Sequence, residues 1–321
     1  MRIDVHAHFF PDALFAVLDR FNLAGPDVPR VLPAGDQPEA LAARFAMMDT
    51  AGVEMQVLSI SSMFPYLDRE NDAVETAHRA NDIYSDAVAR YPERFAAFAA
   101  LPMPHIDASL RELARTLDDL LMAGITIGPT VLGKSVAAAE FEPIYEELNR
   151  RAAVVFMHPC GNGACSPLVR DEGLTWPIGA PFEDTIFALH LIRRQIPIRY
   201  PEIKFIVPHL GGLLPLALDR LDDHAELFTL DPRHPPEPPS AIARRLWFDT
   251  VAHGSIAALR CAHAVFGASR LLHGSDYPFQ LGDGYVRSVS YIRDAGFSAT
   301  DTNAILSDNA TRLLGFAAGK R

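Results

Sequence analysis

The stretch Ala153-Val154-Val155-Phe156-Met157-His158 places five apolar side chains in succession and ends in a histidine. An apolar run of this length is typical of a strand that is covered on both faces, as in a parallel sheet. Seven further short apolar runs occur along the chain, at residues 3–6, 55–59, 95–101, 124–128, 204–209, 246–251 and 270–275. Longer stretches with apolar residues at every third or fourth position lie between them, for example 73–90 and 110–122, and this spacing indicates helices.

Eight strands that alternate with helices predict a (β/α)₈ barrel, the TIM-barrel form of the α/β class, in a single domain of residues 1–321. An open doubly wound sheet is the alternative, but it usually has fewer strands, and no G-x-G-x-x-G turn follows the first strand. Three connections, 21–38, 160–181 and 229–240, are longer or richer in proline and glycine than the others. Because the last one contains five prolines, we expect an extended surface segment there.

The composition disfavours several classes of partner. With 49% hydrophobic and 21% charged residues, the chain has ample material for a buried core. Its net charge of −11 disfavours nucleic acid and anionic membranes, and an anionic substrate would need a local basic group. Cys160, Cys165 and Cys261 lack a paired or zinc-ribbon spacing, so we expect free thiols in a reducing compartment. Met1 is not followed by a secretory leader, and no apolar run reaches the roughly 18 residues of a membrane span, so a cytoplasmic protein is expected.

Residues that bind metals stand where the predicted strands end. Active sites of (β/α)₈ barrels lie at the C-terminal ends of the strands, and here those ends carry His6, His8, His158, His209 and Asp276. His6 and His8 point to the same side because side chains alternate along a strand. Together with His158 and Asp276 they offer three nitrogens and one oxygen, which suits one Zn²⁺ ion with an open position; Mn²⁺ is also compatible. The alternative is that these histidines only make hydrogen bonds near the surface.

The other histidines lie at different distances from the predicted strand ends, and their expected roles differ accordingly. His209 is a candidate for proton transfer because an imidazole titrates near neutral pH, and it is also a candidate fourth nitrogen ligand. His253 follows the seventh strand and is a minor candidate for the pocket. Six histidines in predicted helices or loops are expected to be structural or exposed: His78, His105, His190, His224, His234 and His263.

Four motifs stand out at these strand ends: Ile3-Asp4-Val5-His6-Ala7-His8-Phe9-Phe10-Pro11, Phe156-Met157-His158-Pro159, Pro208-His209-Leu210-Gly211-Gly212 and Gly274-Ser275-Asp276-Tyr277-Pro278-Phe279. Together they resemble the amidohydrolase superfamily, and within it the metal-dependent decarboxylases of the 2-amino-3-carboxymuconate 6-semialdehyde type. The resemblance covers nearly the whole chain and implies a (β/α)₈ barrel with one divalent ion, usually zinc, and often a homodimer. The fourth strand lacks the bridging lysine of binuclear members, so a mononuclear site is implied, and Lys134 is expected at the surface or facing the substrate.

The resemblance also implies roles for individual residues. His209 matches the catalytic histidine of these decarboxylases. Arg220 matches an arginine that binds the substrate carboxylate, sometimes in the neighbouring subunit; its alternative is an exposed helix position paired with nearby aspartates. Trp176 matches a tryptophan that lines the substrate pocket, and Arg30 matches a family arginine through a gapped loop. Phe279, with Tyr277, would form a pocket wall or simply pack.

The expected reaction is non-oxidative decarboxylation of a small unsaturated or aromatic acid, with a metal as Lewis acid and His209 exchanging the proton. The segment 159–163 lacks residues typical of the muconate-semialdehyde enzymes, and Ala180-Pro181-Phe182-Glu183 is similar to a loop segment of hydroxybenzoate decarboxylases, so both acid classes stay open. The ligand set also permits hydrolysis or hydration with Asp276 as the catalytic base. A non-catalytic barrel that binds a metal or a metabolite is a further alternative. No fingerprint of an organic cofactor is present.

Overall fold

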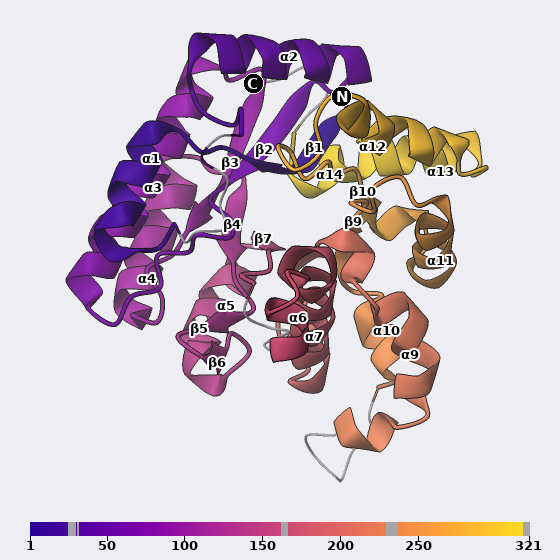
Figure 1. Ribbon diagram of the computed structural model, residues 1–321. Coiled ribbons are helices and arrows are strands. Elements are labelled where there is room, and N and C mark those ends of the chain that lie inside the picture. The colour runs from indigo at the N-terminus through magenta and orange to yellow at the C-terminus, as the bar shows by residue number, and fades with distance from the viewer. Residues whose placement is uncertain (25–29, 31, 162–165, 229–236, 317–321) are drawn as a thin grey trace.

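Eight parallel strands form a barrel with helices on its outside (Figure 1). Around the sheet they follow the order β1 (Ile3–His8), β2 (Met55–Ser59), β3 (Phe95–Ala100), β4 (Gly124–Ile127), β7 (Val154–Met157), β8 (Lys204–Val207), β9 (Trp247–Asp249) and β10 (Leu271–Leu272). The N–H of Val5 donates to the carbonyl of His273 at 3.0 Å and the N–H of His8 to that of Tyr277 at 2.7 Å. These bonds join β1 to the chain after β10 and close the barrel, so the predicted (β/α)₈ architecture is confirmed.

The structure describes residues 1–24, 30, 32–161, 166–228 and 237–316. The longer helices are α1 (Asp12–Leu18), α2 (Pro38–Ala51), α3 (Glu70–Arg90), α4 (Ile106–Ala114), α5 (Glu142–Arg150), α7 (Ala180–Arg193), α9 (Leu214–Asp222), α11 (Ile256–Phe266) and α12 (Asp283–Asp294). Shorter ones are α6 (Pro167–Arg170), α8 (Ile196–Arg199), α10 (Pro239–Ala243), α13 (Ala299–Asn303) and α14 (Asn309–Leu313). Short 3₁₀ segments are η1 (Asp19–Phe21), η3 (Ala139–Phe141), η5 (His209–Gly211), η6 (Ala225–Phe228) and η7 (Ala268–Arg270), and short π-helical segments are η2 (Arg115–Asp119), η4 (Thr175–Gly179) and η8 (Ala304–Asp308).

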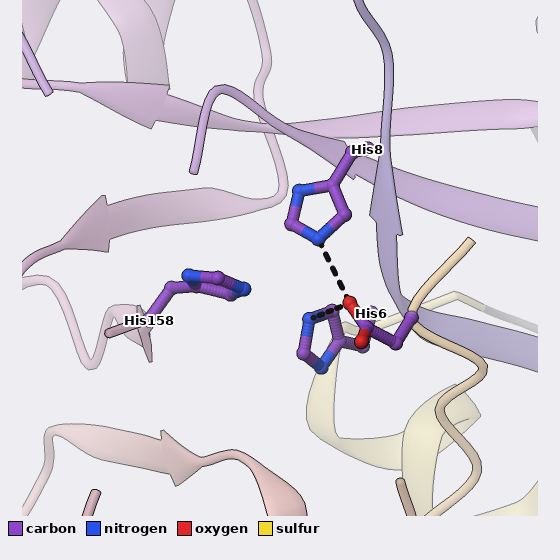
Figure 2. Close-up of side chains that lie close together, drawn as sticks. His6, His8 and His158 are labelled. Carbon is purple, nitrogen blue, oxygen red and sulfur yellow. Dashed lines mark hydrogen bonds and ion pairs between the residues drawn. The ribbon is translucent and has the colours of Figure 1, made fainter. Parts of the chain in front are cut away.

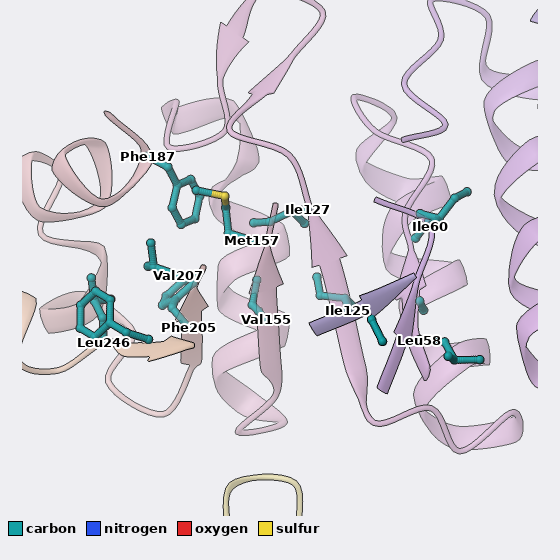
Figure 3. Close-up of a cluster of buried hydrophobic side chains, with 14 of the residues drawn as sticks. Leu58, Ile60, Ile125, Ile127, Val155, Met157, Phe187, Phe205, Val207 and Leu246 are labelled. Carbon is teal, nitrogen blue, oxygen red and sulfur yellow. The ribbon is translucent and has the colours of Figure 1, made fainter. Parts of the chain in front are cut away.

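The core has two layers, which explains why the strands are continuously apolar. Val155 and Met157 of β7 pack outward against the helices, in the cluster that Figure 3 draws. Val154 and Phe156 belong to a second cluster, formed by side chains from strands around the barrel. His158 is the next residue on the Phe156 side, so the alternation of β7 points it inward above this apolar layer.

Two details of the connections differ from the expectations. A two-stranded hairpin of β5 (Thr130–Val131) and β6 (Lys134–Ser135) follows β4 and was not predicted. Residues 180–183 form the first turn of α7 rather than a loop, because Pro181 suits the first turn of a helix, where its missing N–H is no loss. Residues 229–236 of the expected extended segment 229–240 lie outside the described residues, and so does Cys165. Within the described ranges, no helix is long and apolar enough to cross a membrane.

Candidate metal centre and active site

Four buried side chains converge at the C-terminal end of the barrel. One ligand-type atom from each of His6, His8, His158 and Asp276 lies within 4.8 Å of the other three. The three imidazoles, from β1 and from the end of β7, gather around one region in Figure 2. An oxygen of Asp276 lies 3.2 Å from Nε2 of His6 and 3.1 Å from Nε2 of His8. The structure therefore brings together the four residues that were expected to hold a metal.

Hydrogen bonds leave the inner nitrogens of the histidines free for a ligand. Nδ1 of His6 lies 2.7 Å from Oδ2 of Asp249, and Nδ1 of His158 lies 2.8 Å from the carbonyl oxygen of Pro159. Each bond fixes the orientation of its ring, so that Nε2 faces the centre of the cluster, where a bound cation would take the place of its proton. Nε2 of His6 is buried, and Oδ1 of Asp276 lies 3.2 Å from it without forming a well-aligned hydrogen bond.

This donor set fits a divalent ion. Ligand atoms at about 2.0–2.2 Å from a tetrahedral Zn²⁺ lie roughly 3.4 Å from one another, a spacing comparable with the one seen here. A buried nitrogen without a well-aligned hydrogen bond, such as Nε2 of His6, is costly unless an ion occupies the centre. The cluster is accordingly a site for a divalent metal.

The charged groups of the cluster act strongly on one another. Burial opposes a charge on His6, but the carboxylates of Asp249 and Asp276 outweigh it and raise the pKa of His6 to about 9. Burial also opposes the charge on Asp276, yet His6 and His209 hold its pKa well below the ordinary value. Burial, reinforced by His8 and His6, lowers the pKa of His158 well below its usual range. Asp276 is therefore ionised and His158 neutral, the forms that bind a cation.

A buried polar network supports β1 from below. Oδ1 of Asp4 accepts from the backbone N–H of His6 at 3.2 Å and from that of Ser275 at 2.9 Å. Asp4 thus ties the strand that carries the first two histidines to the residue that precedes Asp276. Arg44, buried on α2, donates to the carbonyl oxygen of His8 at 3.0 Å. These bonds set the positions of the ligands before any ion binds.

His209 stands beside the cluster on η5, with a backbone φ of 51°. Its Nδ1 lies 2.8 Å from Oδ2 of Asp184 on α7, and its Nε2 lies 4.0 Å from Oδ2 of Asp276. Burial lowers the pKa of His209, but Asp184 and then Asp276 raise it well above the ordinary value. Burial raises the pKa of Asp184 to about 6, which leaves it ionised at neutral pH. Asp184 therefore favours the charged, imidazolium form of His209.

A cavity of about 640 Å³ opens directly on these residues. His158, His209 and Asp276 line its inner end, and its walls are mostly apolar. Trp176, on η4, and Phe279 are among the lining residues, as expected. The ring of Phe279 packs edge-on against His8, with 5.5 Å between the ring centroids.

The two arginines that were expected to bind the substrate do not line the cavity of their own chain. Arg220 is exposed on α9 and is not among the described residues that line the cavity. Arg30 pairs with Asp19, lies over the ring of Phe15 at 4.4 Å and does not line the cavity either. Their contact with a substrate stays a prediction. Lys134 is exposed and pairs with Glu140 at 2.9 Å, whereas His253 does line the cavity.

Two carboxylates of the site were not anticipated. Asp249 ends β9 and, besides holding His6, accepts from the backbone N–H of His209 at 2.9 Å. Its signal was present, since a carboxylate at the end of a buried strand is a ligand-type residue at a strand end. Asp184 lies inside a helix, and no spacing rule connects it to His209, which is 25 residues away.

Comparisons with known proteins agree with this geometry. The model of the amidohydrolase family matches residues 3–316. The chain is 30% identical to a 2-amino-3-carboxymuconate-6-semialdehyde decarboxylase of Dictyostelium discoideum, over 86% of this chain and 77% of that protein. It is 28% identical to a gamma-resorcylate decarboxylase of Rhizobium radiobacter, over 84% of this chain and 85% of the relative.

A solved structure with the same fold is a dihydroxybenzoic acid decarboxylase from Polaromonas sp. JS666 with bound manganese and the inhibitor 2-nitroresorcinol. Its TM-score is 0.81 at 25% identity, with 98% of this chain and 96% of that chain covered. With the family model matching nearly end to end and the expected ligands clustered at the rim of the barrel, the chain belongs to the amidohydrolase family.

Proposed function

We propose that this protein is a metal-dependent, non-oxidative decarboxylase of a small unsaturated or aromatic carboxylic acid. The observation that carries the proposal is the His209–Asp184 pair, 2.8 Å apart, beside a four-residue metal cluster at the end of an apolar cavity. The decarboxylase names of the relatives support this reaction over hydrolysis, hydration or a purely binding role. Gamma-resorcylate and its analogues are the acids that the cavity walls favour, since aromatic rings suit apolar surroundings.

His6, His8, His158 and Asp276 would hold the ion, which we propose is Zn²⁺, with Mn²⁺ as the alternative that a related structure supports. When bound, a divalent ion supplies positive charge that orients the acid and stabilises negative charge developing on its oxygens. The remaining chemistry belongs to the side chains around it.

His209 is the proposed proton donor. The carboxylate of Asp184 accepts a hydrogen bond from Nδ1–H of His209 and stabilises the positive charge of the imidazolium, so Nε2 carries a second proton at the inner end of the cavity. As the C–C bond to the carboxyl group breaks, its electron pair stays on the substrate carbon and takes up the Nε2 proton, and CO₂ leaves. The product has then gained one proton in place of CO₂, and His209 is recharged from solvent.

The walls of the cavity would exclude water and orient the ring. Phe279 covers the side of the cluster next to His8. Nε1 of Trp176 is buried without a hydrogen-bond partner among the described atoms, so it is free to donate to a hydroxyl group of the substrate. We assign both residues to substrate binding.

We further propose that the protein is a cytoplasmic, single-domain homodimer. Leu213 and Leu216 expose apolar side chains on and next to α9, the helix that also carries Arg220. An interface over this helix would bury them and offer Arg220 to the carboxylate of a substrate bound in the other subunit.

Release of CO₂ tests the proposed function. Metal-loaded protein is incubated with 2,6-dihydroxybenzoate, 2-hydroxybenzoate and an aminocarboxymuconate semialdehyde, and CO₂ and product are measured. We expect CO₂ in equal amount to the decarboxylated product, loss of at least 100-fold in rate in His209→Asn, and an unchanged rate in the control His224→Asn, an exposed histidine. A product that has incorporated water without CO₂ release would contradict the proposal.

A further inference from the structure

The first turns of α7 carry two buried carboxylates in succession, Glu183 and Asp184, and neither side chain is exposed to solvent. Asp184 faces η5 and pairs with His209. Glu183 serves the other side of the site, since its Oε2 accepts a hydrogen bond from the backbone N–H of Cys160 at 2.7 Å and from that of Gly161 at 2.8 Å. The proposed mechanism uses Asp184 and gives Glu183 no part.

The backbone that Glu183 holds comes directly after a strand that leads into the metal cluster. We call residues 158–161 the β7 turn, because they follow that strand. The ring of His158 takes its orientation inside this turn, since its Nδ1 lies 2.8 Å from the carbonyl oxygen of Pro159. Gly161 has a φ of 77°, and two successive N–H groups of the turn face one oxygen, an arrangement that binds anions. The conformation of the β7 turn, and with it the direction of the His158 ring, therefore depends on the carboxylate of Glu183.

The β7 turn also supports a wall of the cavity. A Cβ added at Gly161 would lie 3.2 Å from Cγ2 of Thr175 and 3.4 Å from the indole ring of Trp176, so the turn and η4 are in close contact. Trp176 and Pro159 both line the cavity. A shift of the β7 turn would therefore move Trp176 as well as His158.

A second explanation for Glu183 is the helix itself. An acidic side chain in the first turn stabilises a helix through its dipole, and Glu183 stands in the first turn of α7. An exposed carboxylate would do this equally well, whereas a buried one is costly unless charge-assisted hydrogen bonds replace its water. Two such bonds to the β7 turn, with no exposure of the side chain, favour a role in holding the turn.

We propose that Glu183 is a positioning residue, which holds the β7 turn so that His158 faces the metal cluster and Trp176 faces the substrate. One turn of α7 then orders both sides of the active site, because Asp184 holds His209. The consequence for catalysis rests on the proposed decarboxylation, whereas the effects on metal affinity and on the surroundings of Trp176 do not.

The affinity for a metal measures the direction of His158. Zn²⁺ is titrated into the metal-free protein in competition with a chelator of known affinity. Glu183→Gln keeps the size of the side chain but loses the charge, and we expect the dissociation constant to rise about tenfold or more, as for other groups that orient metal ligands. Glu172→Gln, which changes an exposed acid in the connection between β7 and α7, should leave it unchanged. Equal dissociation constants for Glu183→Gln and the unaltered chain would overturn the inference.

The fluorescence of Trp176 reports the other contact. The chain has two tryptophans, and Trp247→Phe leaves Trp176 as the single one. In this background and without metal, Glu183→Gln is expected to raise the rate constant for acrylamide quenching about twofold or more, because the indole ring loses the support of the β7 turn and opens to solvent more often. A Glu183→Gln variant that only lowers the midpoint of unfolding, with quenching and metal affinity retained, would assign Glu183 to the helix and refute the inference.

A substitution within the turn keeps the test decisive if Glu183→Gln does not fold. Gly161→Ala places a Cβ on a residue with a φ of 77° and against Thr175 and Trp176, while Glu183 stays intact. It should reproduce the weaker metal affinity and the faster quenching. Unchanged values would show that the β7 turn does not set them.

Kinetics separate this inference from the proposed function. At saturating metal we expect Glu183→Gln to raise KM for the acid about tenfold and to keep kcat within about threefold, since the His209–Asp184 pair is untouched. A lower kcat at unchanged KM would place Glu183 in proton transfer and contradict the positioning role. Weaker metal binding and faster quenching, without CO₂ release from any acid by the unaltered protein, would leave the role of Glu183 standing and refute decarboxylation. CO₂ release by the unaltered protein, with metal affinity and quenching the same in the variant, would do the reverse.

Discussion

At the scale of single residues, three histidines of the site take their orientation from the hydrogen-bonding groups around them. Asp249 fixes His6, the carbonyl group of Pro159 fixes His158, and Asp184 fixes His209. The four cluster residues were predictable because each lies at or shortly after the C-terminal end of a strand, and these ends meet at one rim of a barrel. Asp184 was not, since a helix residue approaches the rim only through the packing of α7 on η5.

Asp184→Asn tests the pairing with His209. The amide cannot balance an imidazolium, so His209 loses the charged form that carries the Nε2 proton. We expect kcat for CO₂ release to fall by about 100-fold or more. The metal content, measured by inductively coupled plasma mass spectrometry, should stay unchanged. Asp223→Asn, an exposed acid on the surface next to α9, serves as the control. A variant with full kcat would show that Asp184 has no part in proton transfer.

Gly212 allows α7 to approach η5 closely enough for this pairing. It adopts a φ of 63°, and an added Cβ would lie 2.0 Å from the carbonyl oxygen of Pro181 and 2.6 Å from the hydroxyl of Thr185. Gly212→Ala is expected to lower the free energy of unfolding by about 3 kcal/mol or more. Gly133→Ala, at a φ of 81° with nothing within 4 Å, should cost only about 1 kcal/mol. Equal losses in denaturant titrations would contradict the steric argument.

At the scale of elements, the long apolar strands and the amphipathic helices follow from the sequence, whereas the short elements do not. Each of the eight predicted runs overlaps an observed strand. The hairpin of β5 and β6 has only two residues in each strand, too few for an alternating pattern to appear. The start of α7 was placed in a loop because Pro181 signals a break, although proline is common in the first turn of a helix.

A cluster of charges at the C-terminal end of helix α5 gives a pH-dependent contribution to stability. Glu147 accepts from Arg150 at 2.7 Å and from Arg151 at 2.6 Å, and hydrogen bonds from Arg150 first, opposed by partial burial, lower its pKa to about 2. Because the pKa is lower in the folded chain than in the unfolded one, the contribution is complete above about pH 4.5 and disappears as the pH falls towards 2.

Glu147→Gln should therefore reduce the free energy of unfolding by about 1 kcal/mol at pH 7, a value discounted for solvent screening at this partly exposed site. The difference from the unaltered protein should narrow below about pH 4.5 in denaturant titrations at several pH values. Glu146→Gln, on the exposed side of the same helix, is expected to have little effect. A difference that grows as the pH falls would contradict the sign of the argument.

At the scale of the whole molecule, the barrel turns a set of distant residues into one site. His8 and Asp276 are 268 positions apart, yet their side chains lie 3.1 Å from each other because β1 and β10 close the barrel side by side. Fold and metal ligands were both predictable from the sequence because one rule, strand ends at one rim, governs them. The contact of Arg30 and Arg220 with a substrate stays a prediction, since loops and outer helix faces follow no such rule. With a net charge of −11, the molecule relies on the buried cluster to attract an acid.

The most direct test of the account is the metal content of the purified protein. After incubation with Zn²⁺ or Mn²⁺ and removal of the excess, inductively coupled plasma mass spectrometry should find about one ion per chain. His8→Ala should lose most of the ion, whereas His209→Ala should retain it, since His209 stands beside the cluster and not in it. Protein that folds but holds no ion, or a His8→Ala variant that holds as much as the unaltered chain, would contradict the metal centre on which the chemistry depends.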